Sequence, residues 1–228
     1  MPVAFPHLPW PIELLGRQIG LPSMAAVHPR RHKPLPSARE RIDHTAYELF
    51  SRHGIRAVGV DAIVARSGVA KKTLYFHYPS KEKLALAFLQ RREELWTRAW
   101  LQQGAKRRAR RPADRLLAVF DIFDRWFRRS DFEGCAFVRV LLEHDDPAHP
   151  IRESAEGHIR TVRDFLRRLA EEARVHDPDG FARQWQIVMM GSIIVAYAGD
   201  RDAARRAKKL GALLLADAGI RSRGPAQA

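Results

Sequence analysis

The sequence predicts an all-α protein in which a small, basic three-helix unit precedes a larger helical body. First, apolar residues from Ser37 onward recur at the three- and four-residue spacing of an amphipathic helix. Second, no segment alternates convincingly between apolar and polar residues with the period of a strand. Third, basic charge is concentrated early. The chain up to Arg111 holds 21 Lys and Arg against 8 Asp and Glu, and the chain from Pro112 holds 19 against 18.

The composition limits the classes of function. With 228 residues, 46% of them hydrophobic, the chain is long enough for one or two compact domains. The net charge of +14 and the basic first half favour contact with nucleic acid or an anionic membrane surface over a role in solubility alone. No apolar run approaches the ~18 residues that would span a membrane. The single cysteine, Cys135, excludes an internal disulfide and suits a reducing cytoplasm.

Residues 1–36 are interrupted by eight prolines. Each proline removes a backbone donor and biases the preceding residue away from helix. We therefore expect a flexible Pro-rich arm and no signal peptide. Translation from Met24 is an alternative that would leave a short arm with the basic residues 30–33.

The three-helix unit begins at Ser37, which has Glu40 at capping-box spacing. The apolar face of its first helix ends before Gly54 and consists of Ile42, Ala46, Leu49 and Phe50. Two short helices follow over about 60–66 and 71–77, separated by the turn Ser67-Gly68, where Gly68 permits a positive φ.

The body begins in a long helix from Lys81, capped by Ser80, with an apolar face through Leu84, Phe88, Leu95 and Trp96. Beyond the basic run 106–111, the residues Leu116, Phe120, Phe123 and Phe127 mark a further helix. Further helical segments are expected over about 133–144, 149–175, 179–198 and 202–217.

Two short helices about a tight turn, packed on a preceding helix, form a helix-turn-helix over residues 59–78. A helix of this size fits the DNA major groove. Its exposed positions combine lysine charge with hydroxyl donors for phosphate oxygens, and a lysine follows at the start of the next helix. The candidate DNA-binding residues are Lys71, Lys72, Thr73, Tyr75, His77 and Lys81.

The run from Gly68 to Leu84, GVAKKTLYFHYPSKEKL, resembles the signature of the TetR family of bacterial transcriptional regulators. The upstream residues Ile42, Ala46, Gly54 and Ile63 fit the same frame, so the resemblance spans about residues 37–85. It implies an all-α, TetR-like homodimer of about nine helices that binds double-stranded DNA at a palindromic operator. It also implies a repressor released by a small apolar or aromatic molecule, and it assigns the family's DNA contacts to the same six residues.

The expected organisation has three parts. Residues 1–36 form the arm, residues 37–97 the DNA-binding domain, and residues 98–228 the ligand-binding and dimerisation domain. Three positions depart from the family pattern. Gly59 and Ala70 stand where hydroxyl residues usually cap the two short helices, and Lys72 replaces a small residue.

The body offers candidates for two further surfaces. Aromatic and methionine side chains suit an apolar ligand pocket, although the same spacing is typical of core. Those candidates are Trp96, Trp100, Phe123, Trp126, Phe127, Phe137, Trp185 and Met189. Residues 184–198 are apolar nearly all round, which predicts burial on several sides and a dimer interface, with an ordinary core helix as the alternative. The interface candidates are Gln184, Ile187, Gly191, Ile194, Val195, Leu210, Leu213 and Leu214.

Other functions remain as alternatives. The body could answer to a protein partner and bind no small molecule. An enzyme that uses the residues His144, Asp145 and His149 is a further alternative, but no nucleophile elbow, phosphate loop or metal-ligand spacing supports it. We expect no cofactor and no metal, and we interpret Cys135 as a buried structural residue rather than a thiol sensor. Basic residues spread over several short helices argue against a membrane-surface protein.

Overall fold

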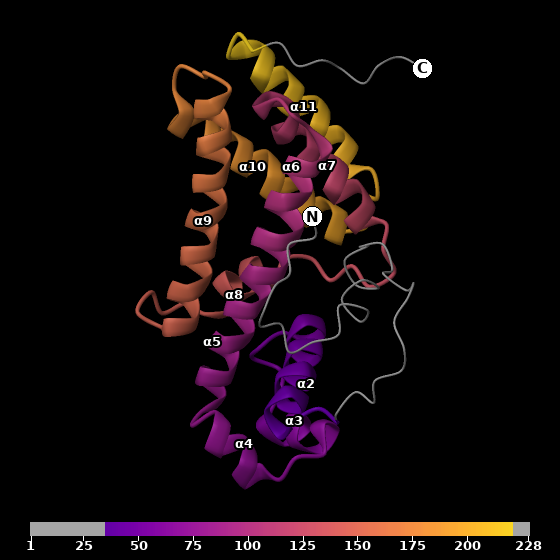
Figure 1. Ribbon diagram of the computed structural model, residues 1–228, viewed down its shortest axis with the longest axis vertical. Helices are drawn as coiled ribbons and strands as arrows, with labels where there is room; N and C mark the ends of the chain where they lie inside the picture. Colours follow the sequence, from indigo (N-terminus) through magenta and orange to yellow (C-terminus); the bar gives the residue numbers. More distant parts are fainter. Residues whose placement is uncertain (1–34, 221–228) are drawn as a thin grey trace. The chain divides into compact units, whose positions relative to one another are not determined.

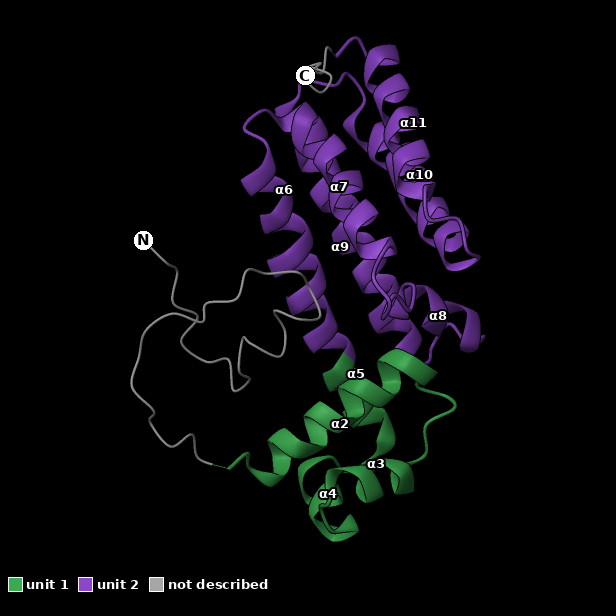
Figure 2. Cartoon of the chain, turned by 90° about the vertical axis from the view of Figure 1, so that its right-hand side faces the viewer, with its two compact units in different colours: residues 1–88 green, residues 89–228 purple. Residues whose placement is uncertain are grey.

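The computed structural model describes residues 35–220 and is all-helical over that range, which confirms the predicted fold class (Figure 1). The predicted arm, including the basic residues 30–33, lies almost wholly outside the described residues. The chain divides into two compact units, residues 1–88 and 89–228 (Figure 2). The predicted domain boundary at 97–98 falls inside the second of these units.

Unit 1 contains α2 (Ala38–His53), α3 (Val60–Ser67), α4 (Lys71–His77) and the beginning of α5 (Lys81–Arg92). The predicted capping box is present: Glu40 N donates to Ser37 Oγ at 3.2 Å, and Ser37 N donates to Glu40 Oε2 at 2.7 Å. Ser80 caps α5 by accepting from Lys83 N at 3.2 Å. Each cap satisfies a donor that the first helical turn leaves without a partner.

The core of unit 1 takes one apolar face from each helix. Ile42, Phe50, Ile63, Leu74 and Leu84 are almost completely buried. The ring of Phe88 lies edge-on to Phe50, with centroids 5.5 Å apart. Because α3 and α4 are too short to be stable alone, this shared core holds them in place.

Tyr78 fixes the end of α4 to α2. Its ring is buried, its hydroxyl donates to Asp43 Oδ1 at 2.5 Å, and the Arg39 guanidinium carbon lies 5.7 Å from the ring centroid. Burial, together with Asp43, raises the pKa of Tyr78 to about 12, so the hydroxyl remains a donor at any physiological pH. The orientation of α4 therefore depends on a buried polar contact as well as on packing.

Unit 2 begins within a long helix. After α5, the chain continues without a break through the π-helix η1 (Glu93–Gln102) into α6 (Gln103–Arg108). Counted as one, these three segments make nine helical rods over residues 35–220, with α7 (Pro112–Phe127), α8 (Ala136–Glu143), α9 (Pro150–Glu172), α10 (Pro178–Tyr197) and α11 (Ala203–Asp217). The periodicity predicted a helix across 93–102 but not its π-helical winding. Such winding is rare in proteins, and where it occurs it is often found at functional sites.

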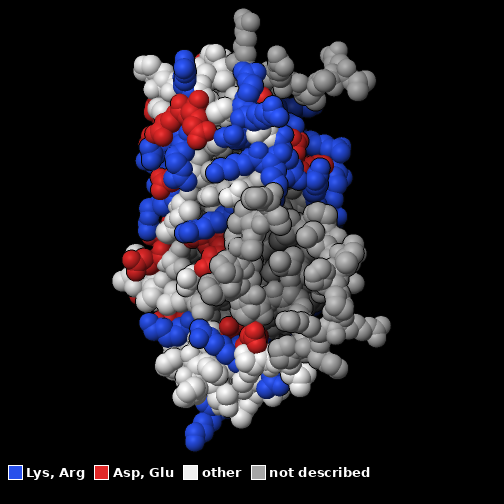
Figure 3. Space-filling view, in the orientation of Figure 1, with Lys and Arg blue, Asp and Glu red and all other residues white. Residues whose placement is uncertain are grey.

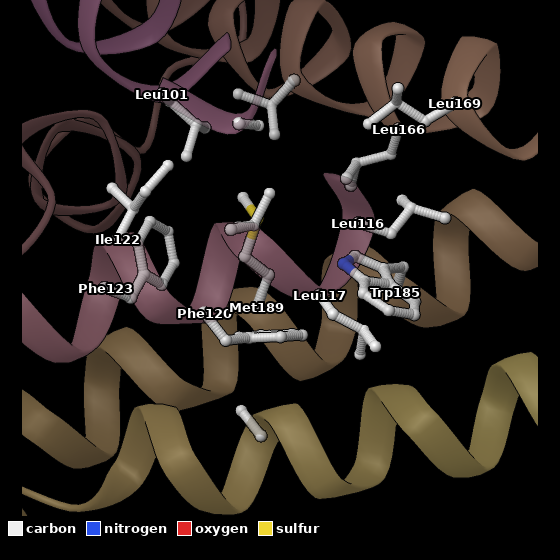
Figure 4. Packing of buried hydrophobic residues seen from close by; sticks show 14 of the residues in the cluster. Leu101, Leu116, Leu117, Phe120, Ile122, Phe123, Leu166, Leu169, Trp185 and Met189 are labelled. Atoms are coloured by element: carbon white, nitrogen blue, oxygen red, sulfur yellow. The ribbon is translucent and has the colours of Figure 1, made fainter. Parts of the chain in front are cut away.

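The core of unit 2 is centred on Trp185 of α10, which is fully buried. Its ring lies 5.4 Å from Phe120 of α7 and 5.4 Å from Phe181 of α10. Figure 4 shows Trp185 and Met189 among the side chains of α7. Helix α11 approaches closely because residue 211 is glycine, where an added Cβ would lie 2.8 Å from Trp185 Cη2.

A buried histidine connects η1 to α9 and α8. His158 of α9 stacks on Phe137 of α8 with ring centroids 3.5 Å apart. Its Nδ1 lies 3.4 Å from Thr97 Oγ1 and 3.8 Å from the Glu93 carboxylate, both on η1. Burial lowers the pKa of His158, outweighing the Glu93 carboxylate, which favours the charged form.

We expect Gly211→Ala to destabilise the protein by about 1–3 kcal/mol, because the added methyl must displace the rigid Trp185 ring. Urea denaturation measures the loss. Gly157→Ala is the control, since its Cβ would meet only Arg160 Nη2, at 3.8 Å, and should stabilise by up to about 1 kcal/mol. A Gly211→Ala variant as stable as Gly157→Ala would contradict the packing described.

We expect stability to fall as the pH drops below about 6.5, the ordinary pKa of histidine. The unfolded chain takes up a proton at residue 158 that the folded protein resists, so the stabilising effect is present above this pH and lost below it. Because only one proton is involved, the loss over each pH unit is at most about 1.4 kcal/mol. Urea midpoints at the two pH values should differ less in His158→Gln, whereas His53→Gln, at an exposed position, should retain the full difference.

Candidate functional site

The helix-turn-helix is formed by α3, Gly68 and α4. Gly68 adopts φ +63°, as the turn was predicted to need, and its N–H donates to Val64 O at 3.2 Å. Helix α4 buries Leu74 and leaves Lys71, Lys72 and Tyr75 exposed. A short helix with one buried and several exposed positions is the arrangement that reading of a DNA groove requires.

The structure places the six predicted DNA-binding residues on one short stretch of unit 1. Lys71, Lys72 and Tyr75 are exposed, and Thr73, His77 and Lys81 are half-buried. Lys71 Nζ lies 2.8 Å from Asp61 Oδ1, and Lys81 Nζ donates to Arg56 O at 3.3 Å. An exposed ion pair is worth at most about 1 kcal/mol, so Lys71 can readily exchange Asp61 for a phosphate.

The two short helices begin without side-chain caps, as their sequences indicated. Gly59 precedes α3 and Ala70 precedes α4, and neither supplies a side-chain hydrogen bond. A missing hydroxyl cap costs about 1 kcal/mol at Ala70 and a few tenths at Gly59. The start of α4 is therefore held by the core and the preceding turn.

Sequence reasoning missed Phe76. It lies on α4 with 82% of its surface exposed, next to Tyr75 at 41%. Single exposed apolar residues are common on protein surfaces, so it is the place of Phe76 on α4 beside Tyr75, and not its exposure alone, that makes it a candidate contact residue. The signal was available in the spacing, because Leu74 takes the inward position and Phe76, two residues on, cannot share that face.

The basic charge is less concentrated in the first part of the chain than the division at Arg111 suggested. The run 106–111 lies in unit 2, so counting by unit gives 13 Lys and Arg against 6 Asp and Glu in residues 1–88, and 27 against 20 in residues 89–228. Each unit thus carries +7. Figure 3 shows Lys and Arg side chains gathered over unit 2 as well. Net charge alone therefore does not single out either unit as the surface that meets a polyanion.

A cavity of about 50 Å³ lies within unit 2, between η1, α7, α8, α9 and α10. Six of the eight predicted pocket residues line it: Trp96, Trp100, Phe123, Trp126, Phe137 and Met189. Phe127 and Trp185 do not line the cavity, and both are fully buried in the core. Arg92, Thr97, Cys135 and His158 are polar lining residues that the sequence did not indicate as a group.

Cys135 lies at the start of α8 and faces this cavity. Burial raises the pKa of its thiol, which lowers the fraction of reactive thiolate at neutral pH. This environment is typical of a structural cysteine.

The outer face of α10 and α11 is apolar and exposed. Ile187 is 73% exposed, Ile194 48%, Val195 47%, Leu210 51% and Leu213 66%. Gln184 and Gly191 are also exposed and Leu214 is half-buried, so all eight predicted interface residues lie on this pair of helices. We refer to these eight residues as the α10–α11 face. Exposed apolar side chains gathered on one pair of helices are typical of an interaction site.

The loop between α8 and α9 uses its polar residues for local structure. His144 Nδ1 lies 3.1 Å from Val140 O, His149 Nδ1 accepts from Ile151 N at 3.2 Å, and Asp146 Oδ1 accepts from Ala148 N at 2.9 Å. Across residues 35–220, no group of three or more His, Cys, Asp or Glu side chains has a metal-binding arrangement. Over the same range, no helix is both long enough and apolar enough to cross a membrane.

Comparison with known proteins matches both units. The family model for bacterial regulatory proteins of the TetR family matches residues 42–88, and the model for the tetracycline repressor-like C-terminal domain matches residues 112–210. The first match covers the helix-turn-helix and the second covers α7 to α10 with part of α11.

Individual relatives agree. The transcriptional regulator YjdC of Escherichia coli is 24% identical over 158 residues, covering 68% of this chain and 81% of YjdC. The transcriptional activator FasR of Mycolicibacterium smegmatis is 34% identical over 149 residues, covering 61% and 64%. A TetR transcriptional regulator from Streptomyces avermitilis superimposes with a TM-score of 0.73 at 31% identity, covering 81% of this chain and all of that one. The chain therefore belongs to the TetR family of DNA-binding transcriptional regulators.

Proposed function

We propose that this regulator is a homodimeric repressor that binds a palindromic operator through α4 and is released by a small apolar or aromatic molecule bound in the cavity of unit 2. The observation that carries the proposal is α4 itself. Its exposed face combines two lysines, a tyrosine and a phenylalanine, and its inner face is held by Leu74 and Tyr78.

The proposed DNA contacts divide by chemistry. Lys71, Lys72 and Lys81 supply charge to phosphates, and the hydroxyls of Thr73 and Tyr75 donate to phosphate oxygens. His77 adds a ring nitrogen near the end of α4. Phe76 completes this set, because an aromatic ring in the major groove contacts the methyl group of thymine, which gives apolar readout of a base.

Dimerisation is proposed through the α10–α11 face. Pairing of this face with its copy about a two-fold axis would bury the five exposed aliphatic side chains at once. Two copies of unit 1 related by the same axis would then match the two halves of a palindrome.

The molecule that releases the protein from DNA is proposed to bind in the cavity, since the aromatic and methionine walls of the cavity are typical of small-molecule sites. A second candidate function is regulation without a small-molecule effector. The volume of about 50 Å³ favours this alternative, because ligand sites are usually several times larger. A ligand must therefore displace side chains of the wall when it binds.

We expect Tyr75→Ala to weaken operator binding about ten-fold, because a hydrogen bond to a charged phosphate is lost. Lys72→Ala should weaken binding and reduce by about one the slope of log affinity against log salt concentration. Titration of labelled DNA from the region upstream of the gene measures both. Lys106→Ala removes the same charge from exposed surface in unit 2 and should leave the affinity nearly unchanged. Unaltered affinity and salt slope in both α4 variants would refute the assignment.

We expect Ile194→Asp to convert the dimer into monomers, since it places a charge within an apolar interface. Sedimentation at micromolar protein concentration distinguishes the two states. Leu142→Asp is the matched control, because Leu142 of α8 is an aliphatic side chain that is 76% exposed outside the α10–α11 face. A parent protein that sediments as a monomer, or an Ile194→Asp variant that remains dimeric, would overturn the interface.

A further inference from the structure

The cavity of unit 2 has flat aromatic walls. The rings of Trp96 and Trp126 lie 5.2 Å apart, those of Trp100 and Trp126 lie 5.6 Å apart, and Trp100 stacks on Phe123 at 6.3 Å with an interplanar angle of 14°. Walls of this kind pair best with another planar ring, which can stack on one wall and lie edge-on to another. An aliphatic chain would gain contact area from them but no such directional contact.

Arg92 gives the cavity a positive charge. It is the only Lys, Arg, Asp or Glu among the described lining residues, and the residue is only 6% exposed. Its guanidinium carbon lies 4.6 Å from the centroid of the Trp96 ring, so the planar group is held against the aromatic wall. A buried guanidinium donates short, charge-assisted hydrogen bonds to a carboxylate and repels a cation.

Two neighbouring groups respond to this charge. Burial raises the pKa of the Cys135 thiol and lowers that of the His158 imidazole. The positive charge of Arg92 opposes the first shift and adds to the second. At His158 the Glu93 carboxylate acts in the opposite sense and more strongly, so the charge of Arg92 favours an anionic group beside Cys135 rather than beside His158.

The volume limits the ligand to a small one. At about 50 Å³, the cavity is well below the ~150 Å³ that accommodates benzene in an engineered protein core. Met189 and Met190 line it, and unbranched methionine side chains rearrange at low cost. Movement of these two side chains can admit one ring, whereas a fused pair of rings would require the tryptophans to move as well.

We propose that the effector of this regulator is a single-ring aromatic carboxylate, whose ring packs against the walls formed by Trp96, Trp100 and Trp126 and whose carboxylate binds the Arg92 guanidinium. This inference rests on the proposed function, because it names the ligand class of the same cavity.

Four probes test the ligand class on the full-length protein near neutral pH. Benzoate has both the ring and the carboxylate, toluene has only the ring, benzylammonium reverses the charge, and acetate has only the carboxylate. Binding is followed by tryptophan fluorescence, since three of the five tryptophans line the cavity, and by calorimetry. We expect benzoate to bind at least ten-fold more tightly than each of the other three. Equal affinity for toluene or benzylammonium, or no binding of benzoate, would overturn the proposal.

Two variants of Arg92 and one control variant locate the carboxylate. Arg92→Gln should weaken benzoate about ten-fold and leave toluene unchanged, whereas Arg168→Gln, an exposed residue of α9, should alter neither. Arg92→Lys keeps the charge but loses the planar pair of donors, so benzoate should weaken while still binding better than benzylammonium. If Arg92→Gln does not fold, Arg92→Lys and the four probes decide the question. Undiminished benzoate binding in Arg92→Lys would exclude a guanidinium–carboxylate pair.

Operator affinity measured with each probe separates this inference from the proposed function. If benzoate binds and operator affinity falls, both the ligand class and ligand-controlled release from the operator are supported. If benzoate binds without any change in operator affinity, the ligand class stands and ligand-controlled release fails. If toluene releases the operator as well as benzoate does, release stands and the carboxylate class fails.

Discussion

The packing of Trp185 against Gly211 is the contact on which the body of this regulator depends. Trp185 is completely buried between α7 and α11, and no side chain at residue 211 would leave room for its ring. This contact fixes α10, which then serves two surfaces. Met189 and Ile193 face the cavity, whereas Ile194 and Val195 lie on the α10–α11 face. Because one helix carries both, a ligand that moved the cavity wall would act on the proposed subunit interface, and dimerisation would in turn constrain the cavity.

The short helices of unit 1 are held in place in a different way. Two of them begin without a side-chain cap. Isolated helices of seven or eight residues are not stable in water, so their positions come from shared burial and from the Tyr78–Asp43 hydrogen bond. The exposed residues of α4 can therefore vary with little effect on the fold. Because the buried residues determine the fold and the exposed residues of α4 do not, a family can keep one fold for this unit and bind many operators.

The sequence was sufficient for the features that depend on local periodicity. It predicted the all-α class, the capping box at Ser37, the turn at Gly68 and the exposed lysines of α4. It could not distinguish cavity residues from core residues of the same type: Trp126 lines the cavity and Trp185 does not, although both lie on amphipathic helices. The π-helical winding of η1 and the burial of Arg92 depend on tertiary contacts, which no short-range pattern encodes. The charge asymmetry was misleading because the count for the first half extended to Arg111 and so included the basic run 106–111, which lies in unit 2.

The exposed ring of Phe76 has a thermodynamic consequence. In the free protein most of this ring is hydrated, and a base step of the operator would cover it on binding. Removal of apolar surface from water lowers the heat capacity, so the binding enthalpy becomes more favourable as temperature rises while the entropic gain shrinks. Operator affinity should then pass through a maximum at some temperature, and the single aromatic ring at position 76 helps to determine where that maximum lies.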